Sequence, residues 1–346
     1  MNTKSSNVLI VVHTEIGLLI AILYYLKYLK NSKKAYFILV KTWKDRFENL
    51  SLDFIPGEYE IVIDELSGSK SSPSDSYKKI FEKKGINELI VQNPLNLLVD
   101  TTINYYQKKY SEVAITLITD GVVTLSPINK KVMFKLFIKH LLRKYINKVN
   151  ELPLFVRQYK DLTNIASTLI SHQNIGFKEF INTQDLLKSI QDNQELLSNL
   201  FKINVDIYKI PEIIFFTQPI HLQKDVKEKY FDLIDKLVIE TEKLNLKIIF
   251  KLHPADDLEL YLHYENSKNV SIDRLNKNIP AEILLKLIQN KSIISVASSL
   301  SLSNLNPTLK HYWLCKMIDY EVDLKTKPEH IIVPKDINSL KKELKR

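Results

Sequence analysis

The chain is poor in the residues that build folds stabilised by disulfides or by metal ions. Its 346 residues include one cysteine, Cys315, and only six glycines. A single cysteine cannot form an internal disulfide and cannot supply a cysteine-rich zinc site. Disulfide scaffolds and zinc fingers are therefore excluded, and the cysteine usage fits a reducing cytoplasm.

The chain also lacks an uninterrupted apolar run of membrane-spanning length. The strongest apolar stretch, residues 8–29, is interrupted by His13, Glu15 and Lys27, and no small-residue cleavage site follows it. We therefore expect neither a signal peptide nor a spanning helix in this stretch. Any contact with a membrane is expected from the side, through basic and aromatic residues at the inner face of the cytoplasmic membrane.

Acidic residues are outnumbered by basic ones. Lysine and arginine total 49 against 40 aspartate and glutamate, which gives a net charge of +9. Much of the lysine excess falls in residues 130–148 and 335–346. A positive balance favours anionic partners without identifying them, so nucleic acid, an anionic membrane and a nucleotide-linked substrate all fit. Most of these lysines are expected simply to solvate the surface.

Short apolar runs alternate with helix-length stretches in both halves of the chain. The runs are residues 7–12, 36–40, 60–63, 89–91, 114–118, 212–217, 247–252 and 292–297. Such alternation predicts parallel sheets covered by helices on both faces. Residues 127–200 carry few strand signals and are expected to be mainly helical. We predict an α/β fold of the GT-B type, with two Rossmann-like domains and the active site in the cleft between them.

The predicted domain boundaries follow this pattern, because 346 residues exceed what one hydrophobic core usually supports. Residues 1–205 form an acceptor-side domain with a helical insertion, and residues 206–320 form a nucleotide-sugar-binding domain. Residues 321–346 are expected to be a tail that packs back on the N-terminal domain.

Polar residues follow the predicted strands at their carboxyl ends, where open α/β sheets build their sites. Asp120 and Gly121 follow residues 114–118. A carboxylate there can act as a general base, and the glycine leaves room for a substrate hydroxyl. An Asp-Gly turn that merely closes the strand is the simpler alternative.

His253 and Pro254 follow residues 247–252 in the same way. Proline restricts His253 to extended backbone, and imidazole supplies a proton donor or a phosphate partner near neutral pH. Ser298 and Ser299 follow the last predicted strand and could hold a phosphate, although a helix-capping serine has the same appearance.

Two weaker signals complete the set. Thr217 and Gln218 end the first predicted strand of the second half, where they could contact a base or ribose. His13 and Thr14 follow the first strand of the chain and are assigned to the acceptor or donor-sugar side, together with Gly121. Five strand ends that carry polar side chains suited to nucleotides and sugars favour such a substrate more than any one of them alone.

Taken in order, these motifs resemble the bacterial sialyltransferases of GT-B fold, which include the lipooligosaccharide sialyltransferases and the capsule polysialyltransferases. That grouping shares an acidic-acidic-Gly motif, an HP motif and a later Ser-Ser/Thr motif. The matching segments are residues 119–121, 253–254 and 298–299, and the loop after the first strand is also similar. Thr119 departs from the first motif, because the grouping has an acidic residue at that position.

The resemblance implies an inverting transfer of sialic acid, or a related nonulosonic acid, from a CMP-activated donor to a hydroxyl of a bacterial surface glycan. It gives Asp120 the role of base and His253 the role of general acid or phosphate partner. It implies no metal or other cofactor, a glycan or glycolipid acceptor, and no nucleic acid. The sequence agrees in having no His/Cys cluster and no obvious Asp-x-Asp motif.

Two other readings stay open. One is a polyol phosphotransferase of GT-B fold with a CDP-linked donor. The other is a non-enzymatic binder of anions or nucleic acid, for which Phe134, Phe137 and Tyr145 stand among lysines as potential stacking residues. We expect a helix to bury these three aromatic side chains in the core.

Overall fold

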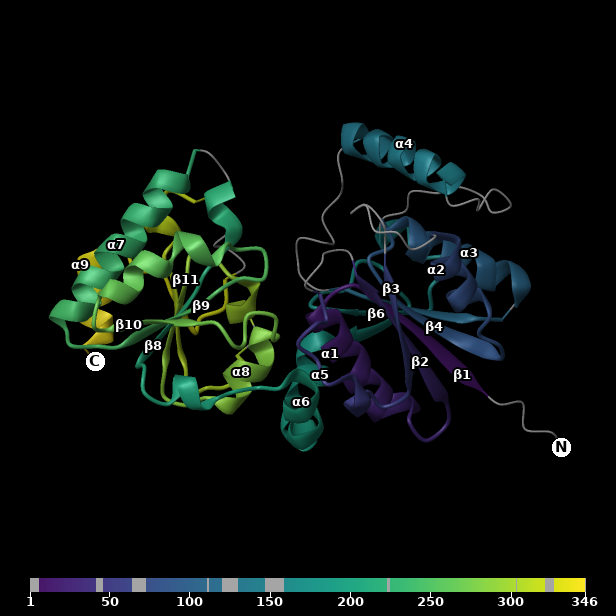
Figure 1. Cartoon of the computed structure of the whole chain (residues 1–346), viewed down its shortest axis with the longest axis horizontal. Coiled ribbons are helices and arrows are strands. Elements are labelled where there is room, and N and C mark those ends of the chain that lie inside the picture. Colours follow the sequence, from purple (N-terminus) through teal and green to yellow (C-terminus); the bar gives the residue numbers. More distant parts are fainter. Residues whose placement is uncertain are drawn as a thin grey trace. The chain divides into compact units, whose positions relative to one another are not determined.

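The computed structural model of the chain describes residues 6–41, 46–63, 73–110, 112–119, 130–146, 159–222, 225–302, 304–320 and 327–345. The chain divides into two compact units, residues 1–202 and 203–346 (Figure 1). Each unit contains one sheet, and neighbouring strands in both sheets run parallel. The predicted α/β class with two Rossmann-like domains is confirmed.

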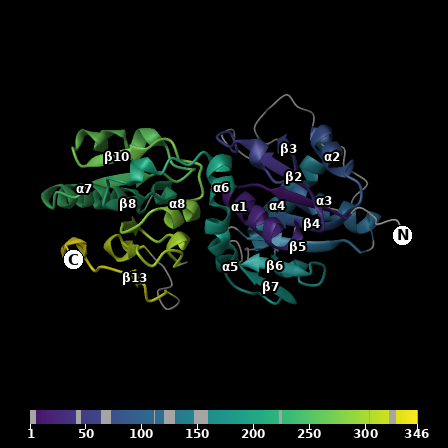
Figure 2. The same ribbon diagram turned by 90° about the horizontal axis from the view of Figure 1, so that it is seen from below.

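The first unit holds a seven-stranded sheet in the order β3-β2-β1-β4-β5-β6-β7 (Figure 2). Its strands are β1 (Asn7–Val12), β2 (Lys34–Lys41), β3 (Glu58–Ile63), β4 (Ile86–Gln92), β5 (Ala114–Ile118), β6 (Thr168–Ser171) and β7 (Glu179–Asn182). The chain moves outward from β1 to β3 and then returns to place β4 on the other side of β1. The strand order therefore reverses between β1 and β4, and a topological switch point lies there.

Helices cover this sheet on both faces, as right-handed crossovers require. They are α1 (Glu15–Tyr24), α2 (Pro73–Phe81), α3 (Leu97–Lys109), α4 (Lys130–Ile146), α5 (Thr183–Leu187) and α6 (Gln194–Phe201). The connection through α1 leads away from β4, whereas those through α2 and α3 lead in the other direction, so α1 and the pair α2–α3 cover opposite faces (Figure 1). Leu9 and Val11 pack with the α2–α3 side in one buried cluster.

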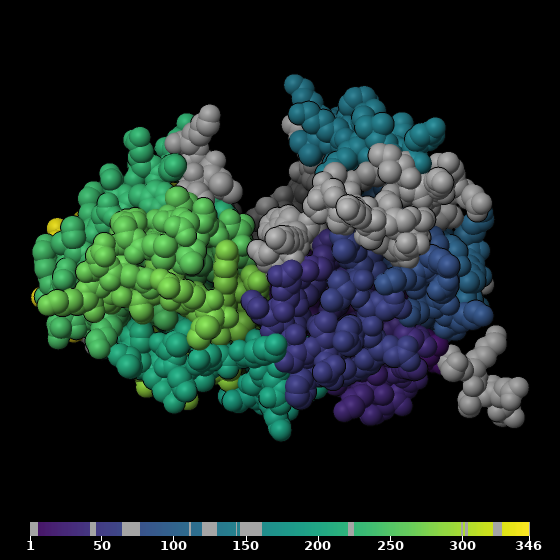
Figure 3. All heavy atoms as spheres, in the orientation of Figure 1, coloured from purple at the N-terminus to yellow at the C-terminus, as the bar shows by residue number. Residues whose placement is uncertain are grey.

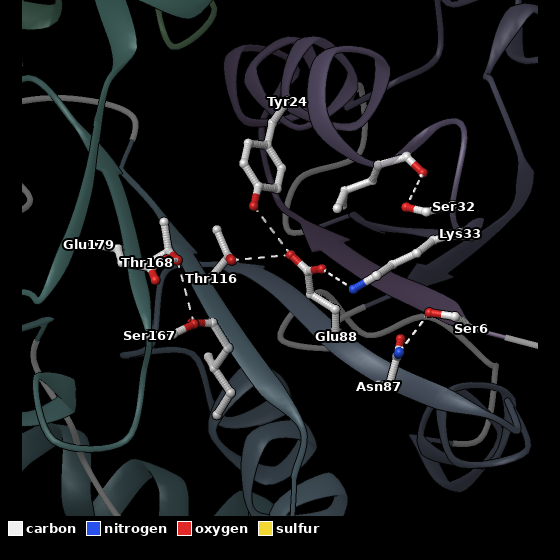
Figure 4. A network of polar contacts seen from close by, with 12 residues as sticks. Ser6, Tyr24, Ser32, Lys33, Asn87, Glu88, Thr116, Ser167, Thr168 and Glu179 are labelled. Carbon is white, nitrogen blue, oxygen red and sulfur yellow. Dashed lines mark hydrogen bonds and ion pairs between the residues drawn. The ribbon is translucent and has the colours of Figure 1, made fainter. Parts of the chain in front are cut away.

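A π-helical turn, Tyr25–Leu29, extends α1, and a buried polar network ties this end of the helix to the sheet (Figure 4). Glu88 of β4 is buried and accepts hydrogen bonds from Tyr24 Oη and Thr116 Oγ1, each at 3.3 Å. Lys33 Nζ lies 2.5 Å from the other carboxylate oxygen. Burial, reinforced by Glu88, raises the pKa of Tyr24. Since Glu88 lies near the beginning of β4, this network is distant from the carboxyl edge where a ligand would bind.

The second unit holds a six-stranded sheet in the order β10-β9-β8-β11-β12-β13. Its strands are β8 (Ile213–Phe216), β9 (Ile248–Lys251), β10 (Val270–Asp273), β11 (Ser292–Ser295), β12 (Lys310–Trp313) and β13 (Ile331–Ile332). Here the order reverses between β8 and β11. The first three strands extend one way from β8, and the last three extend the other way from β11.

The core of the second unit lies between this sheet and two helices, α7 (Lys227–Lys243) and α9 (Ile337–Leu344). A third helix, α8 (Ala281–Leu287), connects β10 to β11. Leu340 of α9 is fully buried, and Lys341 Nζ lies 2.6 Å from a carboxylate oxygen of Glu240 on α7. The final residues, predicted to pack on the N-terminal domain, instead contribute β13 and α9 to the second unit, because Ile331 and Leu340 give them an apolar side to bury there.

Five strands are absent from the sequence-based prediction: β6, β7, β10, β12 and β13. Four of them mix polar and apolar residues within four positions, and β13 has only two residues, so none forms a continuous apolar run. Two of them lie within residues 127–200, which were expected to be mainly helical. Among the described residues, no helix is both long enough and apolar enough to cross a membrane.

One buried histidine makes the second unit sensitive to acid. His311 of β12 is 1 % exposed, its Nδ1 lies 3.2 Å from Ser301 Oγ, and burial together with nearby His330 lowers its pKa from 6.5 to about 4. The unfolded chain therefore takes up this proton first as the pH falls. Stability is complete above pH 6.5 and declines toward pH 4, by about 3 kcal/mol for a shift of this size.

We expect His311→Gln to flatten the decline in the free energy of unfolding between pH 6.5 and 4, measured by urea denaturation. His263→Ala, which removes an exposed histidine of the same unit, serves as the control and should keep the wild-type profile. An unchanged pH profile in His311→Gln would show that other groups cause the decline.

Candidate functional site

One glutamine joins the two loops at the switch point of the second sheet. Gln218 follows β8, and its side-chain oxygen accepts from Ala297 N at 2.8 Å while its nitrogen donates to Ala297 O at 3.1 Å. Ala297 follows β11, so this pair of hydrogen bonds joins the loops after the two central strands. Ligands of open α/β sheets bind at such a point, outside the carboxyl ends of the strands.

Next to this clamp, a buried threonine organises the loop after β9. Thr217 is 3 % exposed; its hydroxyl donates to the buried carboxylate of Asp256 and accepts from His253 N at 2.8 Å. The hydroxyl thus connects three strand-end residues that lie up to 39 positions apart in sequence. Thr217 holds the His253 loop in place.

The imidazole of His253 lies at the exposed edge of this network. Its Nδ1 accepts a hydrogen bond from Ala255 N at 3.1 Å. An accepting Nδ1 means that the neutral ring carries its hydrogen on Nε2. His253 therefore presents an N–H donor, suited to a phosphate oxygen, at the carboxyl edge of the sheet. Pro254 follows it and is half-buried.

Two lysines extend the same network. Lys251, at the end of β9, is 3 % exposed and donates to Lys277 O at 2.9 Å, while Lys277 Nζ donates to Asp256 O at 2.8 Å. Glu282 lies in the first turn of α8, where burial raises its pKa and the charge of Lys251 partly opposes that shift. The side chains of Lys251, Lys277 and Glu282 are thereby held at the edge of the sheet that carries His253.

Ser298 serves the backbone in this structure. Its hydroxyl accepts from Leu300 N at 3.3 Å, as a serine that caps a turn does, and a 3₁₀ turn begins at Ser299. The side chain of Ser299 lies outside the described residues. The capping alternative therefore accounts for Ser298, and phosphate binding by Ser298 and Ser299 stays a prediction.

The first sheet has the same construction at its own switch point. Gln92, the last residue of β4, is fully buried; its side-chain oxygen accepts from His13 N at 2.8 Å and Thr14 N at 3.2 Å, and its nitrogen donates to Thr14 Oγ1 at 2.7 Å. Thr14 in turn caps α1 by accepting from Gly17 N at 3.0 Å. In both units a glutamine joins the loops after the two strands that flank the reversal.

Gly17 is required by this arrangement. A Cβ at Gly17 would lie 2.1 Å from Gln92 Oε1, so Gly17→Ala should expel the glutamine and cost about 2–3 kcal/mol of unfolding free energy. Adding Gln92→Ala removes the clashing atoms. Urea denaturation should therefore find the double variant no less stable than Gln92→Ala alone. Additive losses would show that Gly17 is needed for another reason.

Two predicted site residues, Asp120 and Gly121, lie outside the described residues, so their roles stay predictions. Their neighbour Thr119 is fully buried and donates to Ser171 Oγ at 2.9 Å, which links the ends of β5 and β6. A buried aspartate or glutamate at this position would need to be desolvated. A neutral hydroxyl avoids that penalty.

Five residues of the two switch-point networks were not predicted from the sequence: Gln92, Asp256, Lys251, Lys277 and Glu282. Gln92 ends a predicted strand, so its position alone could have revealed it. Asp257 caps the 3₁₀ turn that follows, accepting from Glu259 N at 3.1 Å, whereas the neighbouring Asp256 is buried against Thr217. Nothing in the local sequence distinguishes these two neighbours, because burial against Thr217 depends on the tertiary fold.

The chain is similar in structure to several solved proteins. UDP-GlcNAc 2-epimerase from Methanocaldococcus jannaschii superimposes with a TM-score of 0.58 at 11% identity, over 99% of this chain and 92% of that one. Its complex with UDP-GlcNAc and UDP gives 0.54 at 12% identity over the same shares. The S. aureus MnaA–UDP structure gives 0.52 at 11% identity, over 90% of this chain and 79% of that one. No protein-family model and no curated protein sequence matches the chain.

These neighbours support the GT-B-like fold and correct the predicted family. The sequence resemblance pointed to CMP-sialyltransferases, whereas the neighbours are named for UDP-GlcNAc and UDP. The prediction of a sialyl-type transferase with a CMP-sugar donor and a glycan acceptor is therefore wrong, and neither the CDP-polyol nor the nucleic-acid alternative gains support. The motifs on which this prediction rested were misleading, because HP and Ser-Ser at strand ends are short and arise wherever Rossmann-like sheets present a polar edge.

Proposed function

We propose that the chain is a UDP-sugar enzyme that holds the nucleotide at the carboxyl edge of the second sheet. The observation that carries this proposal is the switch-point network, in which Gln218 joins two loops and Thr217 fixes His253 beside them. Nucleotides bind at switch points of this kind. The similar structures are named for UDP, and we therefore propose UDP as the nucleotide.

The charges at this edge suit a diphosphate. His253 offers an N–H donor, and the buried Lys251 and the half-buried Lys277 make the surroundings electropositive. Hydrogen bonds between cationic or strongly polar donors and phosphate oxygens are short and strong. Gln218 and Ser298 lie on the adjoining loops, where they could contact the nucleoside or the phosphates.

The reaction that we propose is epimerisation at C2 of a UDP-N-acetylhexosamine, as in the names of the similar structures. Inverting this carbon breaks its C–H bond, and the electron pair left behind can form a C1–C2 double bond as the UDP oxygen leaves C1. UDP then returns to C1 while a proton arrives at C2 on the opposite face. Asp120 and His13 are proposed for these proton transfers on the chemistry of their side chains alone. A carboxylate and an imidazole are the groups that usually carry protons in enzymes.

The test is incubation of the purified protein with UDP-GlcNAc in D₂O, followed by proton NMR. We expect a second UDP-sugar with inverted C2 and deuterium at that carbon. UDP binding without any exchange would overturn the reaction and leave the binding proposal standing. Absence of UDP binding would overturn both.

A cytoplasmic location is proposed on the same basis. UDP-sugars are intracellular metabolites in this proposal, and Cys315 is a buried free thiol whose pKa is raised by burial. A protonated, buried thiol resists oxidation, although it does not require a reducing compartment. Cell fractionation with detection of the chain is the corresponding measurement.

A further inference from the structure

Helix α4 carries a stripe of large apolar side chains that are exposed to solvent. Their exposed fractions range from 40% to 77%. The stripe consists of Phe134, Phe137, Ile138, Leu141, Leu142 and Tyr145. The spacing of three and four residues places all six on one face of the helix. Surfaces of this kind mark interaction sites, whereas scattered apolar residues do not.

This stripe is not the face by which α4 packs on its own unit. The packed face carries His140, which is 2 % exposed, with Met133 and Leu136 half-buried beside it. Helix α3 is the neighbour on that side. Figure 1 shows α4 outside the α2–α3 layer, and Figure 3 shows its atoms at the surface of the unit. The expectation that Phe134, Phe137 and Tyr145 lie in the core is therefore wrong.

The charges of α4 have a single sign. Residues 130–146 contain five lysines and one arginine and no aspartate or glutamate. Lys135 and Lys139 are exposed and follow one border of the stripe. Their aliphatic stems can lie along an apolar phase while the ammonium groups reach its polar boundary.

We infer that α4 lies in the interface of a bilayer that contains anionic lipid. An apolar stripe bordered by lysines is the pattern of an interfacial helix, which is attracted by anionic headgroups and inserts its apolar side chains between them. At 17 residues with six basic side chains, α4 is too short and too charged to span. This inference does not depend on the proposed UDP-sugar activity.

Two other partners fit the same surface less well. A second copy of the chain would bring two purely basic helices together, and like charges oppose that contact. RNA would use aromatic rings for stacking, but three of the six stripe residues are aliphatic and offer no stacking surface. The hydrocarbon region of a bilayer, by contrast, can bury all six side chains of the stripe.

The experiment is co-sedimentation of the full chain with vesicles of phosphatidylcholine alone or of phosphatidylcholine with about a third phosphatidylglycerol. We expect binding to the anionic vesicles that weakens as salt is raised. Lys135→Glu with Lys139→Glu should lower the partition coefficient about tenfold or more, since each lysine near an anionic surface contributes about fivefold. Phe134→Ser with Leu142→Ser should lower it by a similar factor, because the buried apolar area is lost.

Matched controls separate this surface from general effects. Lys227→Glu with Lys236→Glu reverses two exposed charges of α7, and Ile210→Ser with Ile239→Ser removes two exposed apolar side chains of the second unit. Neither pair should change vesicle binding. Equal loss in the controls and the α4 variants would overturn the inference, as would absence of binding to anionic vesicles or retention of RNA in preference to them.

A second readout guards against variants that fold poorly. Phe134→Trp keeps an aromatic side chain at a position of the stripe that is 66% exposed. Its emission, compared with that of the wild type, should shift to the blue when anionic vesicles are added. Emission that stays at the wavelength of a hydrated indole would show that α4 does not enter the bilayer.

Discussion

Replacing His253 by alanine is expected to weaken UDP binding about 10- to 100-fold, the loss typical of one hydrogen bond to a charged group. The neutral ring carries its hydrogen on Nε2 because Nδ1 accepts from Ala255 N, and the residue is exposed. Calorimetric titration with UDP measures the affinity. The midpoint of thermal unfolding without ligand should stay near that of the wild type.

The control is His263→Ala. His263 is also exposed in the second unit, but it precedes β10 and therefore lies toward the amino edge of the sheet. Its loss should leave UDP affinity unchanged. Equal weakening by the two substitutions would show that overall charge, rather than a contact at the carboxyl edge, determines binding.

Replacing Thr217 by valine is expected to lower the free energy of unfolding by about 2–4 kcal/mol, because a buried carboxylate and a partly buried backbone amide each lose a hydrogen-bond partner. The Asp256 carboxylate loses a donor and His253 N loses its acceptor, while the side-chain volume hardly changes. Urea denaturation measures this loss. UDP affinity should fall as well, since the His253 loop is no longer held.

Thr217→Ser is the matched variant, because it keeps the hydroxyl and removes one methyl group. It should stay within about 1.5 kcal/mol of the wild type, with UDP affinity nearly intact. If valine and serine behaved alike, the hydroxyl would not be what positions the loop, and the organisation of the site around Thr217 would be wrong.

The fold was predictable to the extent that its central strands are continuous apolar runs. β1 and β5 were predicted at their observed bounds, because central strands of a parallel sheet are buried on both faces. Strands such as β12, with a buried histidine and tyrosine in four residues, do not form such runs. Their pairing depends on the neighbouring strand, which no local pattern reveals.

The positions of several candidate site residues could be predicted from the sequence, but the residues that they contact could not. Their positions after predicted strands identified Thr217, Gln218, His13 and Thr14 as candidates. In the structure, Thr217 and Gln218 lie at the switch point of the second sheet, and His13 and Thr14 lie at that of the first. The glutamine clamps, the burial of Asp256 and the two lysines depend on contacts between distant segments, for example the 79 positions between Gln218 and Ala297. Periodicity similarly predicted the α4 helix but not which of its faces is covered, and so placed Phe134 inside.

The most direct test of the UDP site is a thermal-shift titration with UDP and CMP, carried out in parallel on the wild type, His253→Ala and His263→Ala. We expect UDP to raise the melting temperature of the wild type and of His263→Ala, and His253→Ala to respond only at far higher concentration. CMP should have little effect on any of them. Stabilisation by CMP in preference to UDP, or a UDP response that is unchanged in His253→Ala, would contradict the proposed UDP site.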